Sequence, residues 1–188
     1  MDKEIWQNIP EGDPVAYAQL YFNYFKKFYN YGKKFTGDIS LIEDSIQEVF
    51  MEIWNKRKKI PEIDSPDSYF FSAFRFILLK KIRQLKRSSG TKQPHNETAF
   101  SIELQIITQE TDSLLQQKLA AALKWLTPRQ KEAIFLRFYE GLSYEEVAAI
   151  LNISVKATYK IIARSITSLK DHICLILVSF LLLQLLPG

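Results

Sequence analysis

The chain has few of the residues that enzymes use for chemistry. Among its 188 residues are one cysteine, Cys174, and two histidines, His95 and His172, which lie far apart in the sequence. These residues provide no disulfide framework, no zinc-ligand spacing and no nucleophile beside an obvious base. The six glycines are scattered singly, so the sequence has no glycine-rich loop for phosphates. We therefore expect no catalytic residue, no metal, no cofactor and no small-molecule substrate.

The N-terminal segment lacks the pattern of a signal peptide. Its first residues are largely polar and Pro10 interrupts them, so the apolar core that such a peptide needs is missing. Together with the single cysteine, this makes a reducing cytoplasm the simplest compartment to expect.

The chain has no large net charge, but its charge is unevenly distributed. The formal net charge is +4, whereas residues 56–92 hold 11 basic and 3 acidic side chains. Residues 1–55 hold 5 basic and 9 acidic side chains, and residues 93–188 hold 9 of each. A concentrated basic block is typical of a surface that binds a polyanion, although a solvated helix face has a similar composition.

A polar linker divides the chain. Helical periodicity runs from about residue 14 to residue 87 and resumes near residue 112, and the stretch between them is mostly polar. Fully extended, residues 88–112 would span about 80–90 Å. We predict an all-α protein of two small helical domains joined by this linker, the second a helix-turn-helix, with an apolar C-terminal helix. The predicted boundaries are 1–87, 88–112, 113–171 and 172–188.

The second half contains helix starts with the spacing of a helix-turn-helix. The pair Thr127-Pro128 offers an N-cap with a first-turn proline, and Gly141 suits a helix end. Residues 143–146 fit a capping box, and Ser154 is the next N-cap. These signals predict a short helix, a turn and a further helix.

Helical periodicity assigns two faces to the helix after Ser154. The predicted packing face consists of Val155, Tyr159, Ile162, Ile166 and Leu169. The opposite face carries Lys156, Lys160, Ala163, Arg164 and Thr167. The basic face is then free to meet phosphates and base edges, and a helical hairpin with a solvated basic face is the alternative.

Three or four helices are predicted in the first half, at about residues 14–35, 39–58 and 66–87. The second of them carries a polar patch formed by Asp44, Gln47 and Glu48 beside an apolar stripe. The third interleaves aromatic residues with the basic residues Arg75, Lys80, Lys81, Arg83, Lys86 and Arg87. Most of these aromatics are expected in the core, but an aromatic beside a basic face also suits single-stranded nucleic acid.

Several segments occur in an order that one protein family shares. They are EDSIQEVFMEIW at 43–54, YFFSAFR at 69–75, the polar linker, LTPRQ at 126–130 and the helix-turn-helix. Arg137 and EGLSYEEVA at 140–148 continue the pattern, and ATYK at 157–160 with Arg164 follows. Over about residues 10–170 this layout resembles the extracytoplasmic-function (group IV) sigma factors of the sigma-70 family. The start of the last helix is similar to the iron-citrate-uptake type.

The resemblance implies two domains with different roles. Residues 1–87 would correspond to the second sigma region, which binds core RNA polymerase and the −10 promoter element. Residues 113–171 would correspond to the fourth region, which reads the −35 element. The protein would be an alternative sigma factor that directs core polymerase to promoters, helps to melt the −10 region and catalyses no reaction. Its implied partners are core RNA polymerase, promoter DNA and a membrane-anchored anti-sigma factor.

The resemblance also assigns site residues. The implied core-polymerase contacts are Asp44, Gln47 and Glu48. The implied −10 contacts are Arg75, Phe76, Lys80, Lys81, Arg83, Lys86 and Arg87, with loop 59–66 close to an extruded base. The implied −35 contacts are Lys156, Ala157, Lys160, Ala163 and Arg164.

Two positions depart from the family pattern. The family usually has an asparagine directly after the arginine matched by Arg75, and often an aspartate four residues later. This chain has Phe76 and Lys80 there, so the resemblance does not assign its specificity for a −10 base. Phe76 either stacks on a base or belongs to the core.

The C-terminal tail lies outside the family pattern. Residues 173–186 are apolar except for Ser179 and Gln184, and at 1.5 Å per residue they span about 21 Å, less than a bilayer core. We expect the tail to pack against this chain or a partner, and contact with a membrane surface is the alternative. A tail between the two domains would hold them in a compact, regulated arrangement.

Two other functions remain compatible with parts of the sequence. A helix-turn-helix regulator that acts without polymerase would explain residues 112–170, but not the polar helix at 39–58. A membrane-associated helical adaptor would explain the apolar tail and little else.

Overall fold

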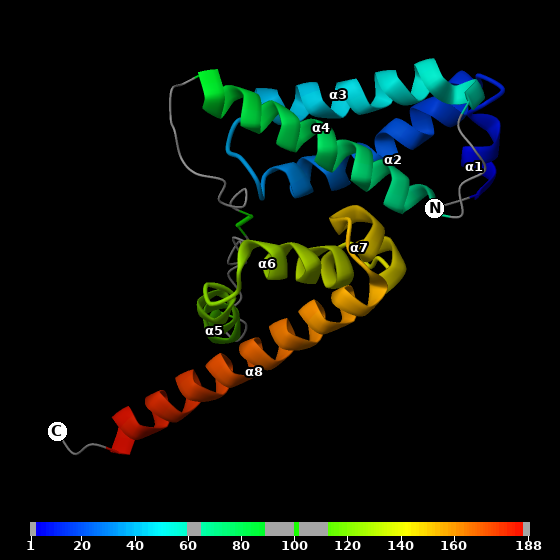
Figure 1. Cartoon of the computed structure of the whole chain (residues 1–188). Coiled ribbons are helices and arrows are strands. Elements are labelled where there is room, and N and C mark those ends of the chain that lie inside the picture. The colour runs from blue at the N-terminus through cyan, green and yellow to red at the C-terminus, as the bar shows by residue number, and fades with distance from the viewer. Residues whose placement is uncertain (1–2, 60–64, 89–99, 102–112, 186–188) are drawn as a thin grey trace.

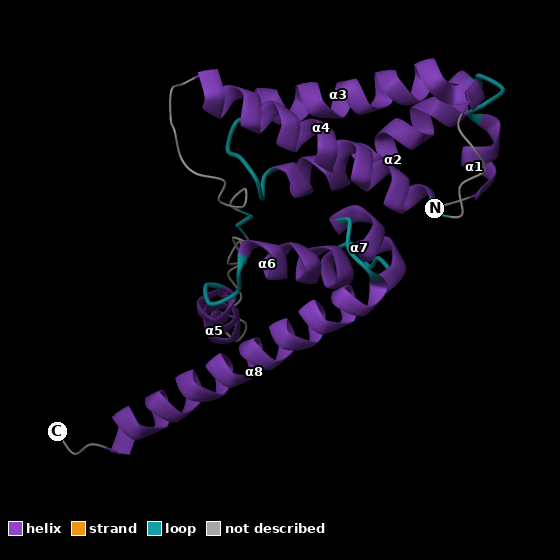
Figure 2. Ribbon diagram, viewed as in Figure 1, coloured by secondary structure: helices purple, strands orange, loops and turns teal. Residues whose placement is uncertain are grey.

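The computed structural model describes residues 3–59, 65–88, 100–101 and 113–185, with the backbone alone at residues 3, 4, 7, 113–116 and 174–185. Within these ranges every regular element is a helix (Figures 1 and 2). Helices α1 to α4 form one unit and α5 to α8 form the other, and the two meet where α4 packs against α7. The predicted all-α class, with two helical domains and a helix-turn-helix, is confirmed.

Four helices build the first unit. They are α1 (Lys3–Asn8), α2 (Pro14–Gly32), α3 (Ile39–Lys56) with a 3-10 turn at Arg57–Lys59, and α4 (Pro66–Ser88). The side chains of Asp13 and Asp38 cap α2 and α3 by accepting the N–H groups of Val15 and Leu41. Helix α1 is not among the predicted helices, and α2 ends three residues earlier than expected.

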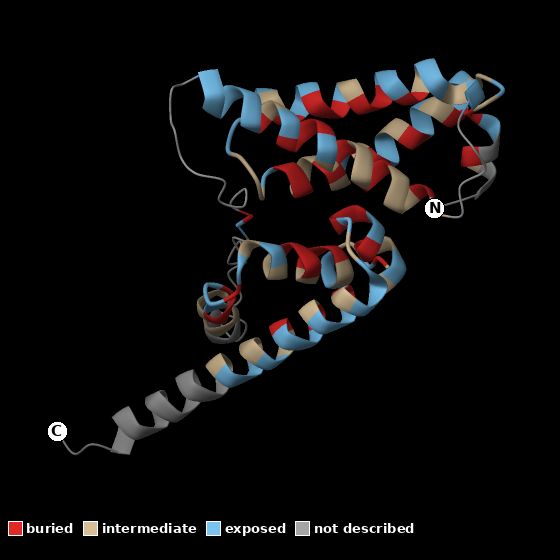
Figure 3. Ribbon diagram, viewed as in Figure 1, coloured by how far each residue is buried: buried red, intermediate tan, exposed pale blue. Residues whose placement is uncertain are grey.

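Aromatic rings fill the core of the first unit. The rings of Phe28 and Phe74 lie parallel with their centroids 4.7 Å apart, so α2 and α4 are in direct contact. Gly32 permits α2 to approach α3 closely, because a Cβ atom there would lie 2.8 Å from Ile42 Cγ2. Figure 3 shows the buried residues on the inner faces of these helices and the exposed residues on their outer faces.

Helices α6, α7 and α8 of the second unit begin directly after the predicted cap residues. Its elements are α5 (Ser113–Leu123), α6 (Pro128–Ile134), the π-helical segment η2 (Phe135–Tyr139), α7 (Tyr144–Leu151) and α8 (Val155–Leu185). Thr127 and Ser143 form the predicted capping boxes, and Ser154 Oγ accepts the N–H of Ala157 at 3.2 Å. Asn152 adopts a left-handed backbone (φ 51°) that turns the chain from α7 into α8.

The packing face of α8 differs from the predicted one. Ile162 is buried as expected, but Tyr159 is 50% exposed and Val155 is 37% exposed, so the prediction is wrong for these two residues. Thr158 and Ser165 are buried instead. Their hydroxyls donate to the carbonyls of Ser154, just before α8, and Ile161, so these small side chains can lie inside a close helix contact without losing a hydrogen bond.

The tail does not lie between the two units. The backbone of α8 remains helical to Leu185 and runs past α6 and α5, away from α2 to α4 (Figure 1). The side chains from residue 174 onward are outside the described residues, so the tail's partner stays a prediction. Among the described residues, no helix combines the length and hydropathy of a membrane-spanning segment.

Candidate nucleic-acid and protein interfaces

The polar patch predicted on α3 is partly exposed. Asp44 and Gln47 face solvent, but the carboxylate of Glu48 lies 2.9 Å from the ammonium of Lys81 on α4. Glu48 is therefore not a free surface carboxylate, because a cation of the neighbouring helix pairs with it. Met51, 59% exposed and one turn further along α3, extends this surface.

A surface hollow adjoins Met51. It has a volume of about 410 Å³ and is lined mainly by apolar and aromatic groups. Its lining residues are Gly12, Pro14, Tyr17, Met51, Trp54 and Asn55. This hollow could not be recognised from the sequence, because its residues come from α2, α3 and the turn before α2, and no single periodic pattern contains them.

One exposed stripe on α4 contains four of the predicted −10 residues. Phe76 is 64% exposed, so the alternative that it belongs to the core is wrong. Three exposed cations follow it at spacings of four, three and four residues, which places all of them on one side of the helix. This α4 stripe consists of Phe76, Lys80, Arg83 and Arg87.

The other predicted −10 residues lie off this stripe. Lys86 is exposed near the end of α4, and Lys81 turns toward α3. The loop expected near an extruded base falls largely outside the described residues, since positions 60–64 are not described. Of its described end, Pro66 is buried and Ser65 contacts α7.

Arg75 faces the second unit rather than solvent. Its Nε and Nη2 atoms donate to Oε1 and Oε2 of Glu132 on α6, at 2.7 and 3.1 Å. Burial disfavours the charged guanidinium, but the hydrogen bonds and charge of Glu132 outweigh burial and raise the pKa of Arg75. Tyr31 Oη also donates to Glu132 Oε1, at 2.5 Å, and burial with this neighbouring carboxylate raises the pKa of Tyr31. Three donors from the first unit therefore bind one carboxylate of the second.

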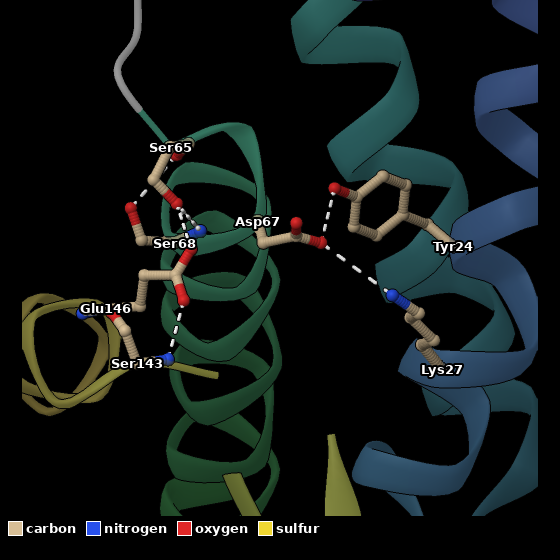
Figure 4. Close-up of polar contacts among 7 residues, drawn as sticks. All are labelled: Tyr24, Lys27, Ser65, Asp67, Ser68, Ser143 and Glu146. Carbon is tan, nitrogen blue, oxygen red and sulfur yellow. Dashed lines mark hydrogen bonds and ion pairs between the residues drawn. The ribbon is translucent and has the colours of Figure 1, made fainter. Parts of the chain in front are cut away.

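The start of α4 is also tied to the second unit (Figure 4). The hydroxyl of Ser65 donates to Glu146 Oε1 at 2.5 Å, while Glu146 Oε2 accepts the N–H of Ser143 at 2.7 Å. Burial raises the pKa of Glu146, but these hydrogen bonds outweigh it and lower the pKa below its ordinary value. The glutamate that completes the capping box of α7 thus also fixes the beginning of α4.

Asp67, in the first turn of α4, anchors the same region to α2 (Figure 4). Tyr24 Oη donates to Asp67 Oδ1 at 2.8 Å, and Lys27 Nζ lies 3.7 Å from the same oxygen. Burial, followed by the charge of Asp67, raises the pKa of Tyr24. These contacts hold the first turn of α4 between α2 and α7.

The basic face at the start of α8 is exposed. Its exposed members are Lys156, Lys160, Ala163 and Arg164, and Ala157 is half-buried with its N–H bound to Ser154. Tyr159 borders this face and stacks on Tyr144, with the ring centroids 4.0 Å apart. Because its spacing matches the apolar residues of α8, Tyr159 could not be recognised from the sequence as a surface residue.

Comparisons with known proteins agree with this architecture. The model described as Sigma-70 region 2 matches residues 20–88, and the model described as Sigma-70, region 4 matches residues 116–169. The ECF RNA polymerase sigma factor SigK of Mycolicibacterium vanbaalenii is 24% identical over 146 residues, which cover 76% of this chain and 74% of SigK. SigK of Mycobacterium tuberculosis (strain ATCC 25177 / H37Ra) is 24% identical over 170 residues, which cover 85% of this chain and 88% of SigK.

Two solved structures share the fold. CnrH, in complex with the cytosolic domain of CnrY, superimposes with a TM-score of 0.59 at 22% identity, covering 90% of this chain and 95% of that chain. RpoE, in complex with the anti-sigma factor NepR from Bartonella quintana, has the same TM-score at 21% identity, covering 82% and 94%. The two family models together match most of the sequence, in the order that the helical units follow, and the chain belongs to the sigma-70 family of RNA polymerase sigma factors.

Proposed function

We propose that this chain is a sigma factor of the extracytoplasmic-function group that directs core RNA polymerase to promoters and holds the melted −10 strand. The observation that carries the proposal is the α4 stripe, where an exposed phenylalanine leads three exposed cations. A duplex-binding regulator that acts without polymerase has no need of such a stripe. The chain itself catalyses no reaction and supplies promoter specificity to the polymerase.

The α4 stripe has the two components that bind single-stranded DNA. An exposed ring offers a face on which a base stacks, and cations along the helix neutralise the phosphates that follow. Phe76 lies at the end of the stripe nearer the loop before α4, which is the loop expected near the extruded base. We therefore assign base stacking to Phe76 and phosphate contacts to Lys80, Arg83 and Arg87.

The start of α8 would read the −35 duplex. A recognition helix enters the major groove with its N-terminal residues against base edges. Lys156 and Lys160 lie in the first two turns of α8, and Arg164 lies one turn further along the same side. The remaining expected contacts, Ala157 and Ala163, are small enough to let the helix approach the bases.

The exposed part of α3 would bind core polymerase. Asp44 and Gln47 offer polar groups, and Met51 with the adjoining hollow offers apolar area, which is the usual composition of a protein interface. Glu48 would contribute less than expected, because Lys81 already neutralises it. Complementary charge with a basic polymerase surface would set the orientation.

Transcription with core polymerase tests the function. The wild-type chain should be retained by core polymerase and support run-off transcription from a promoter selected out of a randomised library. Phe76→Ala should weaken binding of the −10 strand by about 1–3 kcal/mol, the usual contribution of one stacked base. Phe22→Ala is the matched control, because Phe22 is 76% exposed on α2 and lies outside the proposed interfaces. The proposal would be contradicted if core polymerase retained the wild-type chain but no transcript formed, or if Phe76→Ala and Phe22→Ala lost the same binding affinity for the −10 strand.

A charge reversal tests the α3 surface separately. Asp44→Lys should lower the affinity for core polymerase by placing a cation against a basic surface, and the fold should persist because Asp44 is exposed. Glu145→Lys makes the same change at an exposed position on α7, away from this surface, and should leave the affinity unchanged. Equal affinities in both variants would remove α3 from the interface.

The finer assignments belong to the same proposal. The domain boundaries at 87, 112 and 171 and a cytoplasmic location remain predictions from the sequence, and the iron-citrate-uptake type remains a prediction from the resemblance. An anti-sigma partner is supported by the two similar structures, since CnrH is bound to the cytosolic domain of CnrY and RpoE to the anti-sigma factor NepR. We expect a membrane-anchored partner for this chain as well, and co-purification from membrane extracts would test it.

A further inference from the structure

Glu132 is a buried carboxylate, and burial of its charge destabilises the fold unless partners compensate for it. Its side chain is 4% exposed, and a buried carboxylate is unfavourable unless it is paired and hydrogen-bonded. All its described side-chain partners, Arg75 and Tyr31, come from the other unit, 57 and 101 residues away in sequence. The carboxylate is therefore satisfied by these donors only while the two units are in contact.

Arg75, one of the two described partners of Glu132, is also a predicted contact of the −10 element. A guanidinium binds a carboxylate and a phosphate with the same fork of N–H donors, so it cannot hold both at once. In this structure the fork of Arg75 is occupied by both oxygens of Glu132. Arg75 is thus withheld from DNA, although the α4 stripe beside it is exposed.

The same contact keeps the units too close for a promoter. The −10 and −35 elements are named for positions 25 base pairs apart, roughly 85 Å of B-form DNA. Here α4 and α7 pack directly together, so the units must separate before one chain reaches both elements. The basic residues at the start of α8 are exposed in this closed arrangement, so it leaves them free.

The linker reinforces the closed arrangement. Phe100 is 2% exposed, and its ring lies 4.9 Å from that of Phe35 and 5.8 Å from that of Phe135, one in each unit. The N–H of Ser101 donates to the carbonyl of Lys34 at 2.8 Å. Because Phe100 and Ser101 are held by these contacts, only residues 102–112 connect them to α5, and these residues span about 35–40 Å at most.

We propose that Glu132 makes an autoinhibitory contact that occupies Arg75 and holds the two units closed until polymerase or promoter DNA separates them. This inference rests on the proposed function and adds its regulation. Separation is reversible because both partners of the ion pair return to water together, so neither is left as an unpaired buried charge. The contact therefore inhibits −10 binding in the free chain without affecting duplex binding by α8.

Strand binding by the full chain without polymerase tests the contact. Glu132→Gln keeps the shape and loses the charge, and it should tighten binding of a labelled mixed-sequence single strand of about 20 nucleotides. The expected gain is about tenfold or more, the value of one hydrogen bond to a charged group. Glu145→Gln removes the same charge from an exposed position on α7 and should give no such gain. In the Arg75→Gln background, Glu132→Gln should have no effect, and binding of duplex DNA should be the same in wild type and Glu132→Gln.

Small-angle X-ray scattering provides a second readout that does not depend on DNA. Glu132→Gln should increase the radius of gyration, and Tyr31→Phe should change it in the same direction by removing one donor. Tyr31→Phe decides the question if Glu132→Gln does not fold. If Glu132→Gln and Tyr31→Phe had the same strand affinity and radius of gyration as Glu145→Gln, while the chain still supported transcription, the autoinhibitory contact would be wrong and the proposed function would stand. If the variants had a larger radius of gyration but core polymerase did not bind the wild-type chain, the proposed function would be wrong instead.

Discussion

At the scale of single residues, Glu140 is a carboxyl whose surroundings favour the neutral form. It follows η2, and its Oε1 atom is buried without a hydrogen-bond partner among the described residues. Burial raises the pKa of Glu140 from 4.5 to about 7, while Lys27 opposes the rise and Asp67 adds to it. Both charged neighbours belong to the first unit, so this carboxyl reports on the contact between the units.

The raised pKa predicts a loss of stability as pH increases. Between pH 4.5 and 7 the folded chain binds more protons at Glu140 than the unfolded chain, so the free energy of unfolding falls across this window. Glu140→Gln removes the effect and should raise the free energy of unfolding above pH 7 by roughly 1–3 kcal/mol, after allowance for solvent screening. The two proteins should be alike near pH 4. Urea unfolding at both pH values measures the difference.

A matched variant separates this effect from a change in net charge. Glu145→Gln also removes one carboxylate, but from an exposed position, and it should change the stability little at either pH. A stability gain for Glu140→Gln that is equal at pH 4 and pH 8 would contradict a raised pKa.

At the scale of elements, the turn between α7 and α8 depends on one residue. Asn152 has φ 51° and ψ 56°, a left-handed conformation that costs most side chains about 1 kcal/mol and costs asparagine and glycine less. Its N–H donates to the carbonyls of Ala148 and Ala149, which closes the end of α7. This turn sets the direction of α8 and therefore the placement of its basic face.

Substitution at this turn should separate backbone strain from side-chain contacts. Asn152→Ala should lower the free energy of unfolding by about 1 kcal/mol, whereas Asn152→Gly should leave it nearly unchanged because glycine adopts this conformation freely. Both variants remove the same amide, so chemical denaturation of the pair isolates the strain. Equal stability of the two variants would show that the left-handed backbone carries no cost here.

At the scale of the whole molecule, Phe100 couples the two units. Its ring lies among Tyr31 and Phe35 of the first unit and Phe135 of the second, with the centroids 4.9–5.9 Å apart. Units that share a buried side chain unfold together when the shared contact is strong compared with the stability of each unit. We therefore expect the wild-type chain to unfold in one transition.

Removing this ring should divide the transition. Phe100→Ala deletes a fully buried ring, a change that costs about 3–5 kcal/mol in a protein core, and here the loss falls on the contact between the units. Calorimetry should then resolve two transitions. Phe22→Ala, at an exposed position, should keep a single one. A single transition at the wild-type midpoint in Phe100→Ala would show that the units are coupled by other contacts.

Much of the candidate site was predictable from short windows of sequence. The cap residues Thr127, Ser143 and Ser154 are recognised locally, because a cap bonds to N–H groups two or three residues away. The basic stripe on α4 follows from helical spacing in the same way. The family match then assigned the two regions in their observed order.

The sequence by itself determined the helical class, the positions of α2 to α4 and α6 to α8, and the concentration of basic charge in α4. These properties arise from interactions within a few residues. Only the tertiary structure decided that Phe76 is exposed and that Arg75 binds Glu132. Periodicity separates an apolar face from a polar one, but it does not specify which polar side chain meets a partner many residues away. That choice depends on how α4 and α7 pack, and it decides which promoter-binding groups are available in the free chain.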